Sequence, residues 1–406
     1  MASPRRIRIN AQTPPSCPGT YTGGIRCYCY TQDPGLRIEC DANYYSGTSP
    51  EVAKEALIYY QSYGPVVSFY IYDITSTYFT YIPDNFLAGQ IPNVIFQCSH
   101  SQSVNSGLLT FSVNAFNDDL GQCDLTGNVK FKDCNLRQFY GSVFKNCDKL
   151  ENIAFINSHV DGLIDIPTLK SLRNLTVFTP TFWTGATHQG LSLLTLAPGA
   201  SFPLLTYLDL TGNSLNDDSI EFVSQLTVME QLHLEGNNFA SVPNLTDCFN
   251  LHTFSMTLNQ SSSVPILLPN PRSQVQSLTA TFYSNADGVN EVTALEGFLV
   301  NDVINLKLNM TKFTAEVFLD PLVESSGLNI NLNPASRIEC GCSISWLVRD
   351  NPTLLAQVHS GTCADGRPFE SYPLGDVSCC STESLVNLIS RQRQEINDLK
   401  ARLLAE

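Results

Sequence analysis

The sequence contains no uninterrupted apolar run that approaches the roughly 18 residues of a membrane-spanning helix. Residues 396–406 mix charged and apolar side chains, so they also lack the hydrophobic tail of a lipid-anchor signal. We therefore expect no membrane insertion.

Basic residues are few. Lys and Arg total 23 against 38 Asp and Glu, which gives a formal net charge of -15. Nucleic acids and anionic membranes attract proteins through clusters of basic side chains. The charge balance therefore predicts that the chain does not bind nucleic acid, and it leaves the identity of a protein partner open.

The sequence patterns of common catalytic and cofactor sites are missing as well. None of the six histidines belongs to a His-Glu-x-x-His pair, and no Gly-x-Ser-x-Gly elbow, phosphate loop or dinucleotide fingerprint occurs. In Cys27-Tyr-Cys29 and Cys340-Gly-Cys342 the cysteine spacing is too short for a zinc motif, and no histidines cluster beside them. We predict a protein that is not an enzyme and holds no metal or cofactor. An enzyme with an unseen site is the alternative.

Residues 1–16 are expected to be disordered, and the first ten lack the apolar core of a secretion signal. Either the protein is cytosolic, or its natural leader is missing from this sequence. The cysteines favour the second explanation, because two clusters suit disulfide-stapled caps, and disulfides persist in oxidising compartments. The clusters comprise Cys17, Cys27, Cys29, Cys40, Cys340, Cys342, Cys363, Cys379 and Cys380. We therefore predict a secreted protein.

What the chain does have is a repeated leucine phrase. LTYLDLTGNSL begins at Leu205, and MEQLHLEGNNF begins 24 residues later at Met229. A phrase that recurs every 20–29 residues marks a leucine-rich repeat. The sequence therefore predicts an α/β solenoid, a leucine-rich-repeat horseshoe with about ten to thirteen repeats over residues 61–333.

The repeats align on the first apolar residue of a short strand. These residues are Val94, Val129, Ile153, Leu175, Leu208, Leu232, Phe254, Leu278, Leu306 and Ile330. Two longer steps are expected to hide degenerate repeats, at Phe111-Ser-Val113 and at Leu194-Thr-Leu196, and Phe69 is a candidate for an earlier strand.

An asparagine follows five positions after the aligned residue in three repeats, as Asn213, Asn237 and Asn259. We expect these side chains to turn inward and to hydrogen-bond the backbone of adjacent turns. Cys134, Ser158 and Thr311 occupy the same slot in other repeats.

Three mid-chain cysteines share a second phase, six residues before the aligned position: Cys123, Cys147 and Cys248. Sister repeats place apolar residues there, so these cysteines are predicted to fill an apolar core column. A bridge between Cys123 and Cys147 is an open alternative.

The residues between the inward-facing ones should line the concave face, because strand side chains alternate. In the central repeats these are Tyr207, Asp209, Gln231, His233, Glu235 and Thr253. Aromatic residues dominate protein interfaces, so we predict that another protein binds here. A metal or pH switch at His233 is the alternative.

Four sequons offer glycosylation sites. Asn244 lies in a return segment, the stretch of chain that joins one strand of the main sheet to the next, and it is the best candidate. Asn174 and Asn309 flank strands on the concave side. Asn259 is expected to be excluded by its inward slot.

Cysteine caps are expected at residues 17–60 and 334–380, because a solenoid must cover its ends. Trp346 and Leu347 should lie over the last repeat. We expect Cys340 to pair with Cys363, and Cys342 with Cys379 or Cys380.

The stretch Leu332-Asn-Pro334 … Cys340-Gly-Cys342 … Trp346-Leu-Val … Gly-Thr-Cys363-Ala-Asp-Gly366 resembles the C-terminal cap of a secreted arthropod leucine-rich-repeat family. That family includes the non-catalytic subunit of oplophorus-luciferin 2-monooxygenase. The N-terminal Cys17-Pro … Cys27-Tyr-Cys29 … Cys40 is similar too. The resemblance implies a secreted binding or accessory protein without catalytic residues. A growth-factor-binding or innate-immune leucine-rich-repeat protein is an alternative. An enzyme or monooxygenase component with an unseen site is the alternative from another class.

Residues 381–406 are predicted to form an amphipathic helix. Its apolar seam, with spacings of four and three, is typical of a coiled coil. The seam comprises Leu385, Ile389, Gln392, Ile396, Leu399 and Leu403. The sequence leaves two roles for this helix: self-association with a second copy of the chain, or docking on its own chain.

Overall fold

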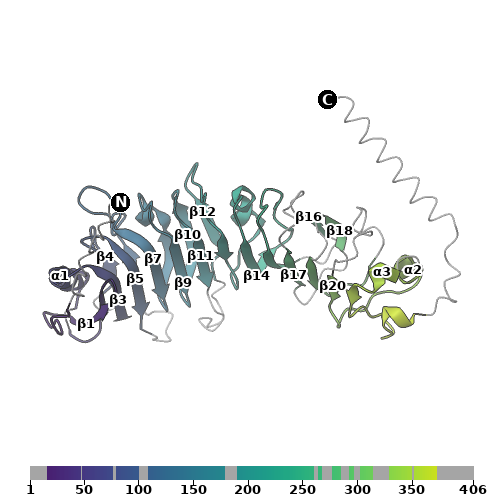
Figure 1. The fold of residues 1–406 in the computed structure, drawn as a ribbon, viewed down its shortest axis with the longest axis horizontal. Helices are drawn as coiled ribbons and strands as arrows, with labels where there is room; N and C mark the ends of the chain where they lie inside the picture. Colours follow the sequence, from purple (N-terminus) through teal and green to yellow (C-terminus); the bar gives the residue numbers. More distant parts are fainter. Residues whose placement is uncertain are drawn as a thin grey trace, which may run out of the picture. The chain divides into compact units, whose positions relative to one another are not determined.

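The structure is a computed structural model, shown in Figure 1. It describes residues 16–46, 48–75, 79–99, 108–178, 190–259, 264–267, 277–284, 292–296, 302–313, 329–349 and 352–372. The chain divides into two compact units, one with Met1–Asn238 and Asp247–Leu251 and one with Phe239–Thr246 and His252–Glu406. The structure is a β-solenoid with few helices, several disulfides and about nine stacked turns, fewer than the ten to thirteen repeats expected.

The first unit is built on a sheet in which all neighbouring strands are parallel except β1 and β2. The sheet order is β1 (Arg26–Gln32), β2 (Gly35–Asp41), β3 (Val66–Ile74), β5 (Ile91–Cys98), β7 (Leu125–Lys132), β9 (Asn152–Ile156), β11 (Asn174–Phe178), β13 (Tyr207–Asp209) and β14 (Gln231–Phe239).

The predicted alignment of this unit is confirmed in the strand register. The residues aligned from Val94 to Leu232 stand opposite one another on successive strands, and Phe69 pairs with Val94. All are buried. Because side chains alternate along a strand, this register sends every second residue to the open face of the sheet.

The return segments of the first unit hold two smaller sheets. One contains β4 (Tyr81–Ile82) and β6 (Thr110–Phe111), and the other contains β8 (Asn135–Tyr140), β10 (His159–Ile166) and β12 (Leu193–Leu196). Phe111 and Leu194 therefore lie in return segments, so the expectation of hidden repeats there is wrong. The two long steps are longer turns of the solenoid.

Among its described residues, the first unit contains the helix α1 (Pro50–Gln61) and the 3-10 segments η1 (Gly141–Phe144) and η3 (Asp217–Gln225). The predicted alternation of strand and α-helix is therefore not found in the described turns. A buried core of stacked phenylalanines fills the space between the two faces. The Phe96 and Phe131 ring centroids lie 5.5 Å apart, and those of Phe131 and Phe155 lie 5.0 Å apart, which is the stacking range for aromatic pairs.

The inward asparagine slot is confirmed at Asn213 and Asn237, which are 4% and 1% exposed. Asn213 donates to Val177 and Leu210 carbonyls and accepts from the Leu191 amide. Ser158 serves the same slot, since it accepts from the Cys134 amide and donates to a backbone carbonyl. Asn259 is exposed instead, so the prediction that it turns inward is wrong.

Disulfides of the first unit lie in its N-terminal cap and between adjacent turns. The predicted cap cysteines pair as Cys17–Cys29 and Cys27–Cys40. The Tyr60 hydroxyl, from α1, ties this cap together by donating to the Cys27 carbonyl and accepting from the Tyr21 amide.

Adjacent turns are joined by two further bonds. Cys123 and Cys147 form a disulfide, which was the alternative left open by the sequence. The prediction that they fill the core as free thiols is therefore wrong. Cys98 pairs with Cys134, a bond that the sequence analysis missed. Cys248 is a buried thiol, as predicted.

The second unit carries the same construction. Its main sheet runs β15 (Thr253–Leu258), β17 (Thr279–Ser284), β19 (Val303–Lys307), β20 (Asn329–Leu332) and β21 (Val358–His359), and β16 (Val264–Leu267) pairs with β18 (Val292–Glu296). Phe254, Ala280, Ile304 and Ile330 stand opposite one another. The expected Leu278 and Leu306 are therefore each two residues out of register. Both still point inward, because a shift of two keeps a residue on the same face.

The C-terminal cap comprises α2 (Cys342–Val348), α3 (Pro352–Leu355) and the 3-10 segment η6 (Phe369–Ser371). The predicted Cys340–Cys363 bond is present, and Leu347 is fully buried. The side chains of Cys342 and Trp346 lie outside the described residues, as do Cys379, Cys380, residues 1–15 and the predicted helix 381–406. Within the described part of the chain, no helix is long and apolar enough to span a bilayer.

Candidate binding face

Most of the predicted binding residues meet on one patch of the first unit. Tyr207 stands opposite Gln231, and Asp209 stands opposite His233. These side chains face away from the buried Leu208 and Leu232. We call Tyr207, Asp209, Thr211, His233 and Glu235 the central patch. Of the other two predicted residues, Gln231 stands opposite Tyr207, and Thr253 belongs to β15 of the second unit.

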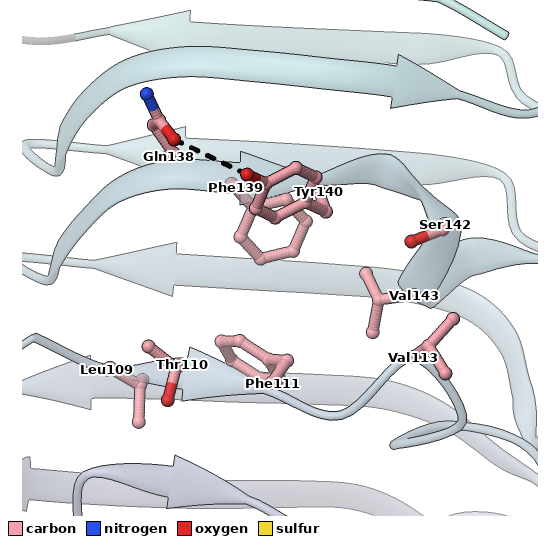
Figure 2. A pocket seen from close by; sticks show the side chains of 9 residues that line it. All are labelled: Leu109, Thr110, Phe111, Val113, Gln138, Phe139, Tyr140, Ser142 and Val143. Carbon is pink, nitrogen blue, oxygen red and sulfur yellow. Dashed lines mark hydrogen bonds between the residues drawn. The ribbon is translucent and has the colours of Figure 1, made fainter.

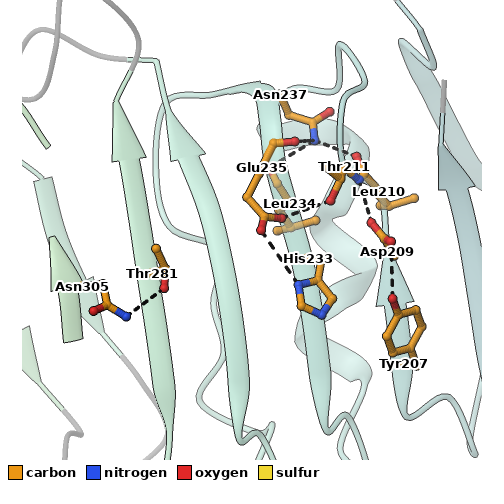
Figure 3. A network of polar contacts seen from close by, with 10 residues as sticks. All are labelled: Tyr207, Asp209, Leu210, Thr211, His233, Leu234, Glu235, Asn237, Thr281 and Asn305. Carbon is orange, nitrogen blue, oxygen red and sulfur yellow. Dashed lines mark hydrogen bonds and ion pairs between the residues drawn. The ribbon is translucent and has the colours of Figure 1, made fainter. Parts of the chain in front are cut away.

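Polar contacts hold the central patch together, as Figure 3 shows. The Tyr207 hydroxyl donates to Asp209 Oδ2 at 3.4 Å, and the Thr211 amide donates to Asp209 Oδ1 at 3.0 Å. The Thr211 hydroxyl donates to Glu235 Oε2 at 3.1 Å, and His233 Nδ1 lies 4.0 Å from Glu235 Oε1. The two carboxylates are therefore oriented by neighbours and not left to rotate freely.

Aromatic rings lie beside these carboxylates. The centroids of Tyr207 and His233 are 5.6 Å apart. Burial, and then the negative charge of Asp209, raise the pKa of the Tyr207 hydroxyl. Tyr207 therefore stays a neutral hydrogen-bond donor, and an aromatic ring of this kind can contact a cation or an apolar group.

The sequence analysis missed the part of the open face that leads up to this patch. Lys130 and Lys132 stand opposite Ala154 and Ile156, which stand opposite Thr176 and Phe178, and Thr176 stands opposite Asp209. The alignment contained the signal, because each of these residues follows an inward-facing position by one.

An asparagine ladder runs along the start of the same strands. Asn128 donates to Asn93, Asn152 to Asn128, and Asn174 to Asn152, while Asn93 donates to the Val67 carbonyl at 3.1 Å. Each asparagine lies one position before an aligned residue, a regularity that the sequence analysis also missed. The ladder fixes the amides to one another, so we assign it to holding the strand starts together.

The predicted glycosylation sites differ in setting. Asn244 is exposed, and its Oδ1 accepts from both the amide and the hydroxyl of Thr246 in its own sequon. Asn174 belongs to the ladder, and Asn309 is exposed and accepts from Asn333. Asn259 is exposed as well. An inward position was the reason for expecting no glycan at Asn259, and that reason no longer holds.

A hollow lies on the return-segment side of the first unit, between β6 and β8 (Figure 2). Its volume is about 310 Å³, and Phe111, Phe139 and Val143 form its apolar part. The Tyr140 hydroxyl donates to Gln138 at 3.4 Å on its rim. The lining includes no charged side chain, so the hollow offers space for an apolar group beside a few hydroxyl and amide groups.

Among the described residues, no group of three or more His, Cys, Asp or Glu side chains is arranged so that it could hold a metal ion. The one described thiol, Cys248, is buried, and burial raises its pKa to about 12. A thiol in that state is a poor nucleophile, because thiolate is the reactive form.

The chain matches no known protein-family model, and no curated protein is significantly similar to it in sequence.

Proposed function

We propose that this protein is a secreted, non-enzymatic binding or scaffold protein, and that it captures another protein on the open face of its first unit. The observation that carries the proposal is the central patch. There an aromatic pair and two oriented carboxylates lie together on an otherwise regular sheet. Hot spots of protein interfaces are commonly such aromatic side chains amid polar groups.

The wider proposal is that the solenoid is of the leucine-rich-repeat type. The inward hydrogen bonds of Asn213 and Asn237 support it, since they tie each turn to the previous one. Five described disulfides support an oxidising, extracellular setting. The resemblance to the secreted arthropod family adds the role of an accessory subunit that supports an enzyme.

Affinity capture from the native tissue fluid tests the function. We expect the immobilised full chain to retain a partner that the variant Tyr207→Ala/His233→Ala retains at least about tenfold less, since truncating a hot spot typically costs 2 kcal/mol or more. Quantitative mass spectrometry of the captured proteins measures the ratio.

The matched control is Leu120→Ala, which removes a side chain that is 83% exposed and lies away from the sheet strands. It should capture as the wild type does. Equal capture by all three proteins contradicts binding at the central patch. Catalytic turnover by the purified chain alone contradicts the non-enzymatic role.

A further inference from the structure

From β7 to β14 the open face of the first unit is ordered by charge, and this order suggests what kind of partner segment it binds. Lys130 and Lys132 of β7 lie at one side, and Asp209 and Glu235 of β13 and β14 lie at the other. The inference rests on the proposed function, because it concerns the same face.

An uncharged strip separates the two charged sides. It consists of Ala154 and Ile156 on β9 and Thr176 and Phe178 on β11. The Phe178 side chain is 36% exposed although it is a large apolar group. An aromatic ring kept at the surface between two lines of charge is a natural contact point for an apolar partner group.

The width of the strip matches a helix. The strands from β7 to β13 are joined by three parallel pairings. At roughly 4.8 Å per strand, the lysines and Asp209 lie about 14 Å apart. An α-helix with its side chains is about 10–12 Å across, so a helix lying along the strip reaches both charged sides.

We propose that this face docks an amphipathic α-helix of a partner protein, with an acidic edge over Lys130 and Lys132, an apolar stripe on Ile156 and Phe178, and a basic edge over Asp209 and Glu235. The ring of Tyr207, beside Asp209, receives a Lys or Arg of the basic edge. Helices recognised in this way lie with their apolar face on the receiving surface.

The charge order disfavours other occupants. A polyanion such as nucleic acid meets Asp209 and Glu235, and a polycation meets Lys130 and Lys132. Like charges brought together at an interface cost several kcal/mol. A segment with opposite charges on its two sides avoids both penalties.

Synthetic helical peptides of about 21 residues test the proposal against the full chain. One peptide carries a leucine stripe with glutamates on one edge and lysines on the other, and two comparators carry lysines on both edges or glutamates on both edges. A helix can dock in either direction along the strip, so uniform edges are the informative comparison. Fluorescence anisotropy measures the affinities.

We expect the wild type to bind the mixed-edge peptide at least about tenfold more tightly than either comparator, which corresponds to about 1.4 kcal/mol. Lys130→Glu/Lys132→Glu should shift the preference to the lysine-only peptide. Asp209→Lys/Glu235→Lys should shift it to the glutamate-only peptide. Phe178→Asp should weaken binding of all three. Misfolding cannot produce the two opposite switches in preference.

Equal affinities for the three peptides, or charge reversals that leave the preference unchanged, overturn the inference. If the tissue partner is still captured through Tyr207 and His233 in that case, the proposed function stands without the helix. If the peptides follow the predicted order but capture ignores Tyr207 and His233, the helix site stands and the proposed function fails.

Discussion

At the scale of single residues, asparagine performs two separate tasks in this fold. On the open face Asn93, Asn128, Asn152 and Asn174 bond to one another and stay half-exposed. Inside, Asn213 and Asn237 each bond the backbone of two turns. A short side chain that both donates and accepts can fill the inner slot, and Asn213, Asn237 and Ser158 do so.

Asn237→Ala should lower the free energy of unfolding by about 2–4 kcal/mol. Asn237 donates to the Leu210 and Leu234 carbonyls at 2.8 and 3.1 Å and accepts from the Leu215 amide at 3.1 Å. Its removal leaves buried backbone groups without partners, each at a cost of about 1–3 kcal/mol. Urea denaturation measures the change. The exposed Asn244→Ala is the control, and an equal effect from both variants contradicts the structural role.

The Cys248 thiol should resist alkylation in the folded protein. It is fully buried, and burial raises its pKa to about 12. At pH 8 the unfolded chain therefore holds far more thiolate at this position than the folded chain, and only thiolate reacts. Iodoacetamide labelling with and without urea, read by peptide mass spectrometry, measures the difference. Rapid labelling without urea contradicts the burial.

At the scale of elements, the sequence predicted strands well and return segments poorly. Inward positions from Val94 to Leu232 were predicted in register because strand alternation and the repeat period act together. Leu278 and Leu306 were two residues out, since a period-two pattern is unchanged by that shift. Phe111 and Leu194 resembled repeat strands because short return strands carry the same apolar pattern.

The central patch was predictable for the same reason as the strands. Asp209 and His233 were placed side by side by the alignment alone. The residues of the asparagine ladder and of the charge order from Lys130 to Asp209 also adjoin the aligned positions, but the prediction of the open face covered the central repeats alone. Asn259 was misplaced, because its position in the repeat does not determine the path of the chain after β15.

The Cys98–Cys134 bond replaces a hydrogen-bonded slot with a covalent one. Cys134 occupies the asparagine position of its turn, and Cys98 ends the preceding strand, β5. The bond closes a loop of 36 residues.

Cys98→Ala/Cys134→Ala should destabilise the chain by about 2–4 kcal/mol, the usual contribution of a disulfide. Thermal unfolding followed by circular dichroism measures the loss. The comparison is repeated in reductant, where the wild type has lost its bond too and the gap should shrink. An unchanged gap in reductant would assign the loss to packing of the two side chains.

At the scale of the whole molecule, the described disulfides are unevenly distributed. Cys17–Cys29, Cys27–Cys40, Cys98–Cys134 and Cys123–Cys147 all lie in the first unit, and Cys340–Cys363 lies in the second. In repeat proteins stability is a sum of local terms, so parts of one array can unfold separately.

We therefore expect two unfolding transitions in calorimetry, and reductant should lower the transition of the first unit more than that of the second. Hydrogen exchange with mass spectrometry assigns each transition, since peptides from β5 to β11 report on the first unit and peptides from β15 to β20 on the second. The control is the same scan with an oxidised reductant of equal concentration. A single transition, or equal shifts in both, would mean that the two units unfold together, because cooperative coupling spreads the loss of a local bond over the whole chain.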